Sequence, residues 1–269
     1  MITSLDHIAL AVQDFGAATE AYEALIGRRS EREPPEGGAR RAWFHLDNMS
    51  LEIIAADGEG PAGDRVRAHL ADEGEGLVAL AFGVEDLVGA LRLCERRGLA
   101  ALAPEDSAGK AVWLARDTTG LPMVLVGPKA RPASASIGEE RASLSGLDHV
   151  VVQSPNPDRT LALYGAKLGL DLRLDRSNPA WGARQMFFRC GGNLVEIVHS
   201  LKDGVSDGPD RFGGLAWRTA DPEAARERLA KAGFNVSEVR KGRKPGTRVF
   251  TVRDRTFGVP TLVLGATTD

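Results

Sequence analysis

Two stretches of the chain, 142 positions apart, have nearly the same sequence. Residues 5–12 read LDHIALAV and residues 147–152 read LDHVVV. After a shift of two positions the match resumes downstream, as SLEII at residues 50–54 and LVEIV at residues 194–198. An internal repeat of this kind predicts that the two halves of the chain share one architecture.

The segment between the two halves has the composition of a linker. Residues 127–146, GPKARPASASIGEERASLSG, are rich in Pro, Ser, Ala and Gly and show little apolar periodicity. The chain of 269 residues is long enough for two domains with separate cores. We therefore predict an N-terminal domain over residues 1–126 and a C-terminal domain over residues 147–269.

Each half divides again into two similar modules. The first module reads as a strand at 5–12, a helix at 15–26 capped by Asp14, a strand near 28–33 and a hairpin over 40–54. The same order recurs in residues 77–126, 147–199 and 212–264. In the second module we expect a helix at 86–97 and middle strands near 99–103 and 111–115. The predicted fold class is α+β, with four βαβββ modules forming two domains.

Composition narrows the class of protein and its partners. A net charge of −3 and a pI near 6.0 give no sign of a nucleic-acid or membrane partner. No apolar run approaches the roughly 18 residues of a membrane span, and the N-terminus does not resemble a signal peptide. Cys94 and Cys190 lie in apolar surroundings in different halves, which predicts buried free thiols. These features predict a cytoplasmic protein.

The four-module pattern resembles the vicinal oxygen chelate superfamily, which contains glyoxalase I, bleomycin-resistance proteins and extradiol dioxygenases. The resemblance rests on the DHI and DHV openings, the Y-x4-G helix ends, the LEI and VEI strands, and the turns ARDTTG at 115–120 and VRDRTFG at 252–258. It implies that modules pair edge to edge and that each pair of curved sheets wraps a cleft. A fold of this kind supports many chemistries, so it does not define one function.

Strand parity places the candidate site residues of the first half. Alternate residues of a strand share a face, so His7 lies on the face turned away from the helix. Pairing the hairpin about its Asp-Asn turn sets Trp43 opposite Glu52 and His45 opposite Ser50. We expect Trp43, His45 and Glu52 to share the cleft face with His7.

His149 and Glu196 occupy the matching positions of the second half. The equivalent Gly-Gly turn sets Phe187 opposite Glu196 and Arg189 opposite Leu194. An imidazole and a carboxylate on neighbouring strands are suitable ligands for Zn, Fe, Ni or Mn. The sequence therefore predicts a metal-ligand pair in each half.

The other two modules contribute no metal ligand. By the resemblance, a metal site takes ligands from the first and last strands of both modules of a pair. The aligned positions in the second and fourth modules are Ala79, Val124, Gly214 and Leu262. Each cleft then has two ligands, whereas a tight site normally needs three from the protein.

Three arrangements remain open at this point. Each His–Glu pair could form a charge-assisted hydrogen bond on the cleft floor without metal. Alternatively, His45 could join His7 and Glu52 as a third ligand. In the last arrangement, module one pairs with module three, within a chain or across a homodimer, and assembles a four-ligand His2Glu2 site.

Two functions follow from these arrangements. As a glyoxalase-like lyase or isomerase, the protein would hold a small oxygenated metabolite on a divalent metal, while Glu52 or Glu196 moves the proton. Extradiol dioxygenation is disfavoured, because the fourth module lacks ligands. As a metal-free binding protein of the bleomycin-resistance kind, it would hold its ligand by stacking and charge, using Trp43, His45, Phe187 and Arg189.

Overall fold

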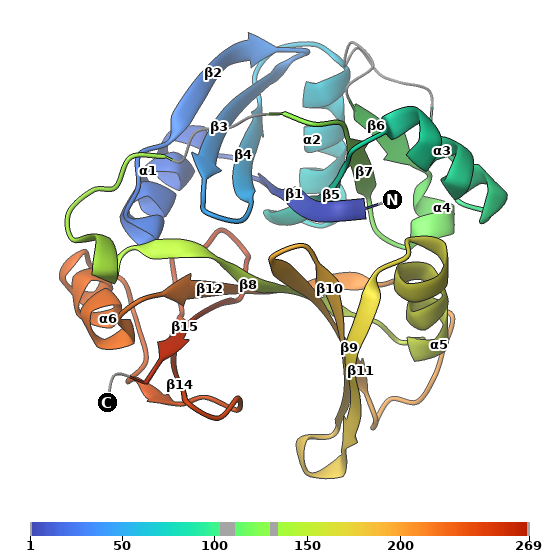
Figure 1. The fold of residues 1–269 in the computed structure, drawn as a ribbon. Helices are drawn as coiled ribbons and strands as arrows, with labels where there is room; N and C mark the ends of the chain where they lie inside the picture. The colour runs from blue at the N-terminus through green and yellow to red at the C-terminus, as the bar shows by residue number, and fades with distance from the viewer. Residues whose placement is uncertain (1, 103–110, 130–133, 268–269) are drawn as a thin grey trace. The chain divides into compact units, whose positions relative to one another are not determined.

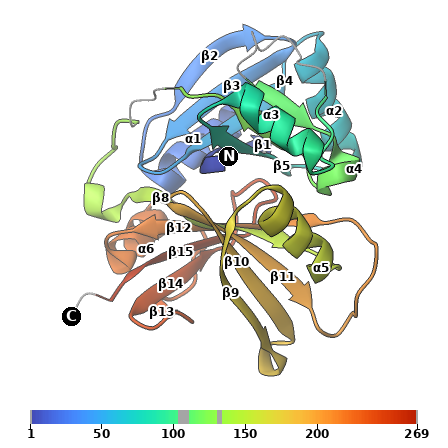
Figure 2. The same ribbon diagram turned by 45° about the vertical axis from the view of Figure 1, so that its right-hand side comes forward.

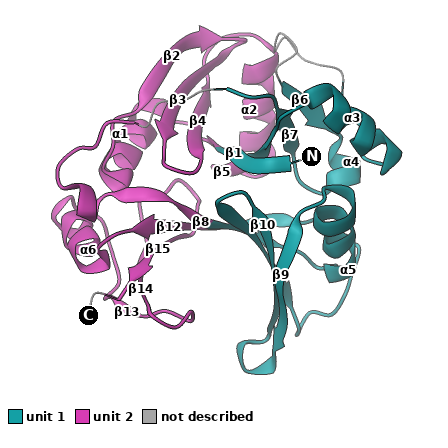
Figure 3. Cartoon of the chain, viewed as in Figure 1, with its two compact units in different colours: residues 1–8, 79–130, 149–213 teal, residues 9–78, 131–148, 214–269 magenta. Residues whose placement is uncertain are grey.

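The computed structural model describes residues 2–102, 111–129 and 134–267 (Figure 1). The chain separates into two compact units, which Figure 3 shows in different colours. Unit 1 comprises residues 1–8, 79–130 and 149–213, and unit 2 comprises residues 9–78, 131–148 and 214–269. Each unit therefore draws on both halves of the sequence.

The strands of the described residues form two mixed sheets, in agreement with the predicted α+β class. The first sheet has the strand order β2-β3-β4-β1-β5-β7-β6. Its strands are β1 (Ile2–Ala11), β2 (Glu31–Glu36), β3 (Ala39–His45), β4 (Ser50–Ala56), β5 (Gly76–Val84), β6 (Ala111–Leu114) and β7 (Met123–Val126). Modules one and two therefore contribute to the same sheet.

The second sheet has the order β13-β14-β15-β12-β8-β11-β10-β9 among the described residues. Its strands are β8 (Leu144–Gln153), β9 (Asp171–Asn178), β10 (Ala183–Cys190), β11 (Asn193–Ser200), β12 (Arg211–Thr219), β13 (Arg240–Lys241), β14 (Thr247–Val252) and β15 (Thr261–Ala266). Strand β8 begins three residues before the end of the predicted linker. Modules three and four share this sheet, and Figure 2 shows its strands from a second side.

The first helix forms where the sequence predicts it. Helix α1 (Phe15–Ile26) begins after Asp14, whose carboxylate accepts a hydrogen bond from the Ala17 backbone N–H. It ends at Gly27, which has φ of 78°, a left-handed conformation that suits glycine. Its Tyr22 ring is fully buried and lies 6.5 Å from the Phe44 ring of β3.

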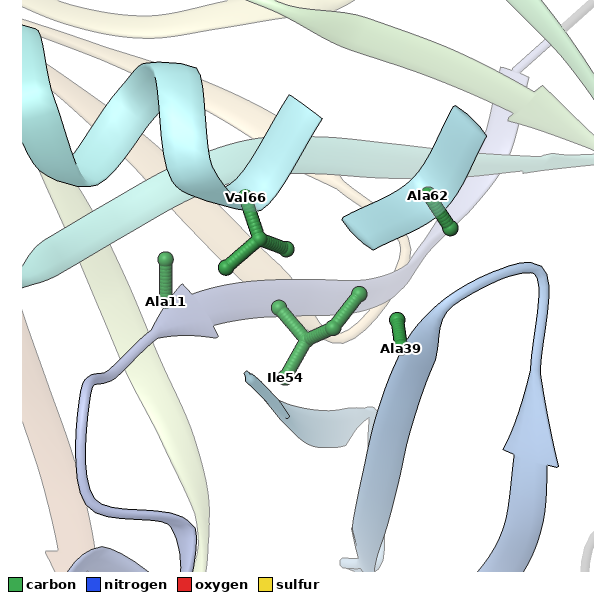
Figure 4. Close-up of a cluster of buried hydrophobic side chains, with 5 residues drawn as sticks. All are labelled: Ala11, Ala39, Ile54, Ala62 and Val66. Carbon is green, nitrogen blue, oxygen red and sulfur yellow. The ribbon is translucent and has the colours of Figure 1, made fainter. Parts of the chain in front are cut away.

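Helix α2 (Pro61–Asp72) was not predicted, and it lies between the first and second modules. Its apolar side chains recur every four residues, at Ala62, Val66 and Leu70, which places them on one helical face. Figure 4 shows Ala62 and Val66 above the sheet, packed with Ala11, Ala39 and Ile54. Because Ile54 and Glu52 are two positions apart on β4, α2 covers the sheet face that carries Glu52.

Close backbone contacts hold the start of α2 against the β2–β3 turn. The backbone N–H groups of Ala62 and Gly63 donate to the Gly37 carbonyl at 3.0 and 3.1 Å. A Cβ atom at Gly63 would collide with the Gly38 carbonyl oxygen. The glycines therefore allow an approach that larger residues would prevent.

The helices predicted in the second and fourth modules form, the helix of the third module differs in type, and three short helical segments were not predicted. Helix α3 (Leu87–Arg96) is capped by Asp86, and α6 (Pro222–Lys231) is capped by Asp221. The short helical segments are α4 (Arg116–Thr119), η1 (Glu140–Ala142) and η3 (Pro179–Trp181). In the third module, α5 (Pro157–Thr160) continues as a π-helix, η2 (Leu161–Lys167), rather than as a regular α-helix.

Two predicted strands differ from the structure. The strand expected near 28–33 is β2, which begins three residues later, at Glu31. Of the strand expected near 99–103, the described residues show an isolated bridge between Ala101 and Leu114, and residue 103 lies outside the described residues. Both cysteines are free and buried, as predicted.

Within unit 2, side chains connect the first module to the fourth. Arg228 of α6 donates hydrogen bonds to the carbonyls of Ala24 and Leu25, at the C-terminal end of α1. The Tyr22 hydroxyl donates to the Thr256 carbonyl at 3.1 Å. A cation at a helix C-terminus satisfies carbonyls that have no partner within the helix.

Candidate functional site

The hairpin of β10 and β11 has the predicted register. Phe187 pairs with Glu196 and Arg189 with Leu194. Strand β8 lies parallel to β11, with His149 beside Leu194. Because alternate residues share a face, His149, Phe187 and Glu196 lie on the same side of unit 1.

A buried polar group occupies this face. His149 Nε2 lies 3.1 Å from Glu196 Oε2, and the Gln185 amide nitrogen donates to Glu196 Oε1 at 2.6 Å. Glu196 is 6% exposed and Gln185 is 7% exposed. The carboxylate is therefore held by an imidazole on one oxygen and by an amide on the other, as a buried carboxylate requires.

Apolar and aromatic side chains surround the polar group. The His149 and Phe187 rings meet edge to face at 6.0 Å, and Leu174 of β9 pairs with Phe187. Leu174 is 41% exposed and Trp181 is 39% exposed, with the Arg176 guanidinium 4.7 Å from the Trp181 ring. Exposed large apolar side chains beside buried polar groups are characteristic of ligand-binding surfaces.

Gln185 was not predicted as a site residue, and the contacts of Arg189 do not favour the ligand-binding role predicted for it. Gln185 is two residues before Phe187, so strand parity alone places it on the same face. The exposed Arg189 guanidinium pairs with Asp171 at 3.1 Å, at the outer edge of the sheet. Gln185, rather than Arg189, contacts Glu196.

The hairpin of β3 and β4 in unit 2 also has the predicted register, with Trp43 opposite Glu52 and His45 opposite Ser50. The Trp43 and His45 rings are stacked, with centroids 6.2 Å apart. His45 Nδ1 lies 2.8 Å from the Ser50 hydroxyl, and His45 Nε2 lies 3.2 Å from Glu31 Oε2. Both ring nitrogens of His45 therefore have partners from within the hairpin and β2.

Glu52 lies among arginines. Arg41 Nε donates to Glu52 Oε1 at 3.0 Å, and Glu52 is 7% exposed. Burial and the nearby Arg41 guanidinium lower the pKa of Arg65, on α2, while Glu52 acts in the opposite direction. The carboxylate of the first half is therefore neutralised by guanidinium groups and covered by α2.

His7 lies on the part of β1 that belongs to unit 1. Its Nδ1 is 2.6 Å from Asp6 Oδ1, and both side chains are mostly buried. Glu52 belongs to unit 2. That His7 and Glu52 share one cleft stays a prediction.

The donor set does not fit a tight metal site. Among the described residues, no group of three or more His, Cys, Asp or Glu side chains converges closely enough to hold a metal ion. His149 and Glu196 supply two ligands, and the Gln185 NH2 group that contacts Glu196 is a donor that cannot bind a cation. The Arg41 and Arg65 charges beside Glu52 oppose a divalent cation there.

Comparisons with known families agree with this fold. Two models of the Glyoxalase/Bleomycin resistance protein/Dioxygenase superfamily match the chain, one over residues 6–114 and the other over residues 146–261. The chain belongs to this superfamily, with one such domain in each half. No curated protein matches the chain.

Solved structures support the same architecture at low sequence identity. The chain is similar to a triple mutant of 4-hydroxymandelate synthase from Streptomyces coelicolor, with 15% identity and a TM-score of 0.74, over 98% of this chain and 93% of that one. It is also similar to BphC, a halotolerant catechol dioxygenase, with 14% identity and a TM-score of 0.70, over 100% and 89% of the two chains. These similarities show the fold and do not transfer an activity.

Within the described ranges, each helix is too short or too polar to cross a bilayer.

Proposed function

We propose that the protein binds a small molecule without a metal ion, on the unit 1 face formed by β8, β10 and β11. The observation that carries the proposal is the group of His149 with the buried Glu196 and Gln185, beside the partly exposed Phe187 and the exposed Leu174. Such a surface offers apolar contact area together with a few placed polar groups. The function is closest to that of bleomycin-resistance-type binding proteins.

The face that carries Glu52 supports this role less well. Helix α2 packs against Ala39 and Ile54, on the side of the sheet where a ligand would lie. The predicted aromatic contact there, Trp43, is 9% exposed, whereas Leu174 on the other face is 41% exposed. We therefore assign ligand binding to the third module and a structural role to Glu52.

Glyoxalase-like proton transfer is a second candidate at the same site. The contact between His149 and Glu196 favours it, because an imidazole beside a carboxylate can exchange a proton with it. In this candidate Glu196 takes a proton from the ligand and His149 stabilises the resulting charge distribution. Neither step needs more metal-binding side chains than His149 and Glu196.

Nuclear magnetic resonance can test the binding site directly. The probe is 3-methylindole, titrated into isotope-labelled protein with and without excess EDTA. We expect shifts in the amide signals of β8, β10 and β11, unchanged by EDTA, and weaker binding in Phe187→Ala. Trp43→Ala is the matched control and should bind normally. Shifts that vanish with EDTA, or no shifts on these strands, would overturn the proposal.

A further inference from the structure

One atom of the unit 1 face has no hydrogen-bond partner. The His149 imidazole lies 3.1 Å from one oxygen of Glu196, and the other oxygen accepts from Gln185, so the Gln185 amide presents its NH2 group to the carboxylate. Its carbonyl oxygen, Oε1, then points elsewhere. Among the described residues this oxygen is buried and has no partner.

A buried acceptor without a donor is costly, and proteins rarely keep one. Gln185 cannot relieve this cost by rotating its amide, because rotation would set its carbonyl oxygen against the Glu196 carboxylate. In the reversed amide, the Gln185 carbonyl oxygen and the Glu196 carboxylate oxygen would face each other, and two acceptors repel. The contact at 2.6 Å thus holds Oε1 in a single orientation.

The side chains around Gln185 indicate the chemical character of the rest of the ligand. On β10, Phe187 is the next residue on the same face, and Leu174 lies across from Phe187 on β9. On the other side, Gln185 pairs with Val198 of β11, which is partly exposed. These side chains offer apolar surface around one acceptor.

From this geometry we propose that Gln185 is a specificity residue that accepts a hydrogen bond from the ligand. The ligand class is a flat, apolar molecule that carries one N–H or O–H donor. This inference rests on the proposed function, because it concerns the same face. It adds that the site distinguishes ligands by the presence of a donor and not by a negative charge.

Two isomers of identical composition test this proposal. In 3-methylindole the ring N–H is free, and in 1-methylindole a methyl group replaces that hydrogen. A site with an unpaired acceptor should prefer 3-methylindole by about tenfold, since an unmade buried hydrogen bond costs on the order of 1.4 kcal/mol. The dissociation constants come from amide-shift titrations of the full chain in EDTA.

A pair of variants identifies the atom that causes the preference for 3-methylindole. Gln185→Met keeps the length of the side chain and removes the acceptor, so both isomers should bind with equal affinity. Gln153→Met is the matched control, because Gln153 is an exposed glutamine of β8 on the same face, and it should keep the preference. A preference that survives in Gln185→Met would assign the acceptor to another group and overturn the proposal.

The wild-type comparison needs no variant, so the test remains valid if Gln185→Met fails to fold. Equal affinity for the two isomers in the wild-type protein would overturn the role of Gln185 and leave the proposed binding function standing. No binding of either isomer to β8, β10 and β11 would overturn both. A preference that is lost only in Gln185→Met would support both.

Discussion

At the residue scale, Glu52 and Glu196 occupy the same position of the repeat and have different partners. Glu196 contacts an imidazole and an amide, and Leu174, across from Phe187 on the same face, is exposed. Glu52 contacts the guanidinium of Arg41 and lies under α2. The same residue type therefore belongs to the proposed binding face in one half and neutralises arginine in the other.

Removal of the Arg41 charge should destabilise the fold. Arg41→Met would leave Glu52 buried without its cation, so we expect the free energy of unfolding to fall by about 1–3 kcal/mol in a urea titration. Arg40→Met is the matched control, because Arg40 is next in sequence and pairs with Asp57, where both side chains are well exposed. It should cost less than about 1 kcal/mol. Equal losses in the two variants would contradict a structural role for Glu52.

The Cys190 thiol should be unreactive in the native protein. Burial raises the pKa of this thiol from 9.0 to about 12, so it stays protonated at pH 8. We expect 5,5′-dithiobis(2-nitrobenzoate) to label it only at the rate of unfolding. Because the folded-state pKa is the higher one, its stabilising effect is present below about pH 9 and is lost as the pH rises toward 12. Rapid labelling of native Cys94→Ser protein would contradict this burial.

At the scale of elements, α2 determines which sheet face a ligand could reach. The helix begins beside Gly37 and Gly38 and covers the face of β4 that carries Ile54. Between the third and fourth modules, the described residues 201–210 form turns and irregular structure in place of a helix. The connection between modules is therefore one source of the asymmetry between the two halves.

A single methyl group should weaken the attachment of α2. Gly63→Ala places a Cβ atom against the Gly38 carbonyl oxygen, so we expect a loss of about 1–3 kcal/mol by chemical denaturation. The matched control is Gly16→Ala, in the first turn of α1, where the nearest atom to the new Cβ lies 3.5 Å away. That change should be neutral or stabilise by up to about 1 kcal/mol. Unchanged stability in Gly63→Ala would show that α2 is not held at this contact.

At the scale of the whole molecule, the two compact units do not coincide with the two halves of the sequence. Unit 2 joins the first module to the fourth, through contacts of Arg228 and Tyr22. Unit 1 joins the second module to the third, and Arg97 of the second module donates to the Lys167 carbonyl at 2.9 Å. In both units an arginine satisfies carbonyls at the end of a helix from the other half.

The contact between α6 and α1 should contribute measurably to stability. Arg228→Met leaves the carbonyls of Ala24 and Leu25 without their charged donor, so we expect a loss of about 1–3 kcal/mol in thermal or urea unfolding. Arg226→Met is the matched control, because Arg226 lies on the same helix and pairs with the exposed Glu238. It should change stability by less than about 1 kcal/mol. A control loss as large as that of Arg228→Met would contradict the assignment.

Features that depend on local hydrogen bonding and strand parity could be predicted from the sequence. The bounds of α1, the register of both hairpins and the pairing of His149 with Glu196 all follow from spacing along the chain. A cap residue, a turn and a two-residue alternation act over a few positions, so their signals are present in the order of residues.

Other features required the tertiary structure. The sequence shows neither the π-helical turns of η2 nor which face α2 covers, because both depend on the space left by distant residues. Gln185 carries no motif, and strand parity places it on the face of Glu196 without showing that its amide donates to that carboxylate. Which modules form a compact unit depends likewise on contacts such as those of Arg228, more than 200 positions from its partners on α1. Packing joins residues by proximity in space, and the order of residues along the chain does not encode that proximity directly.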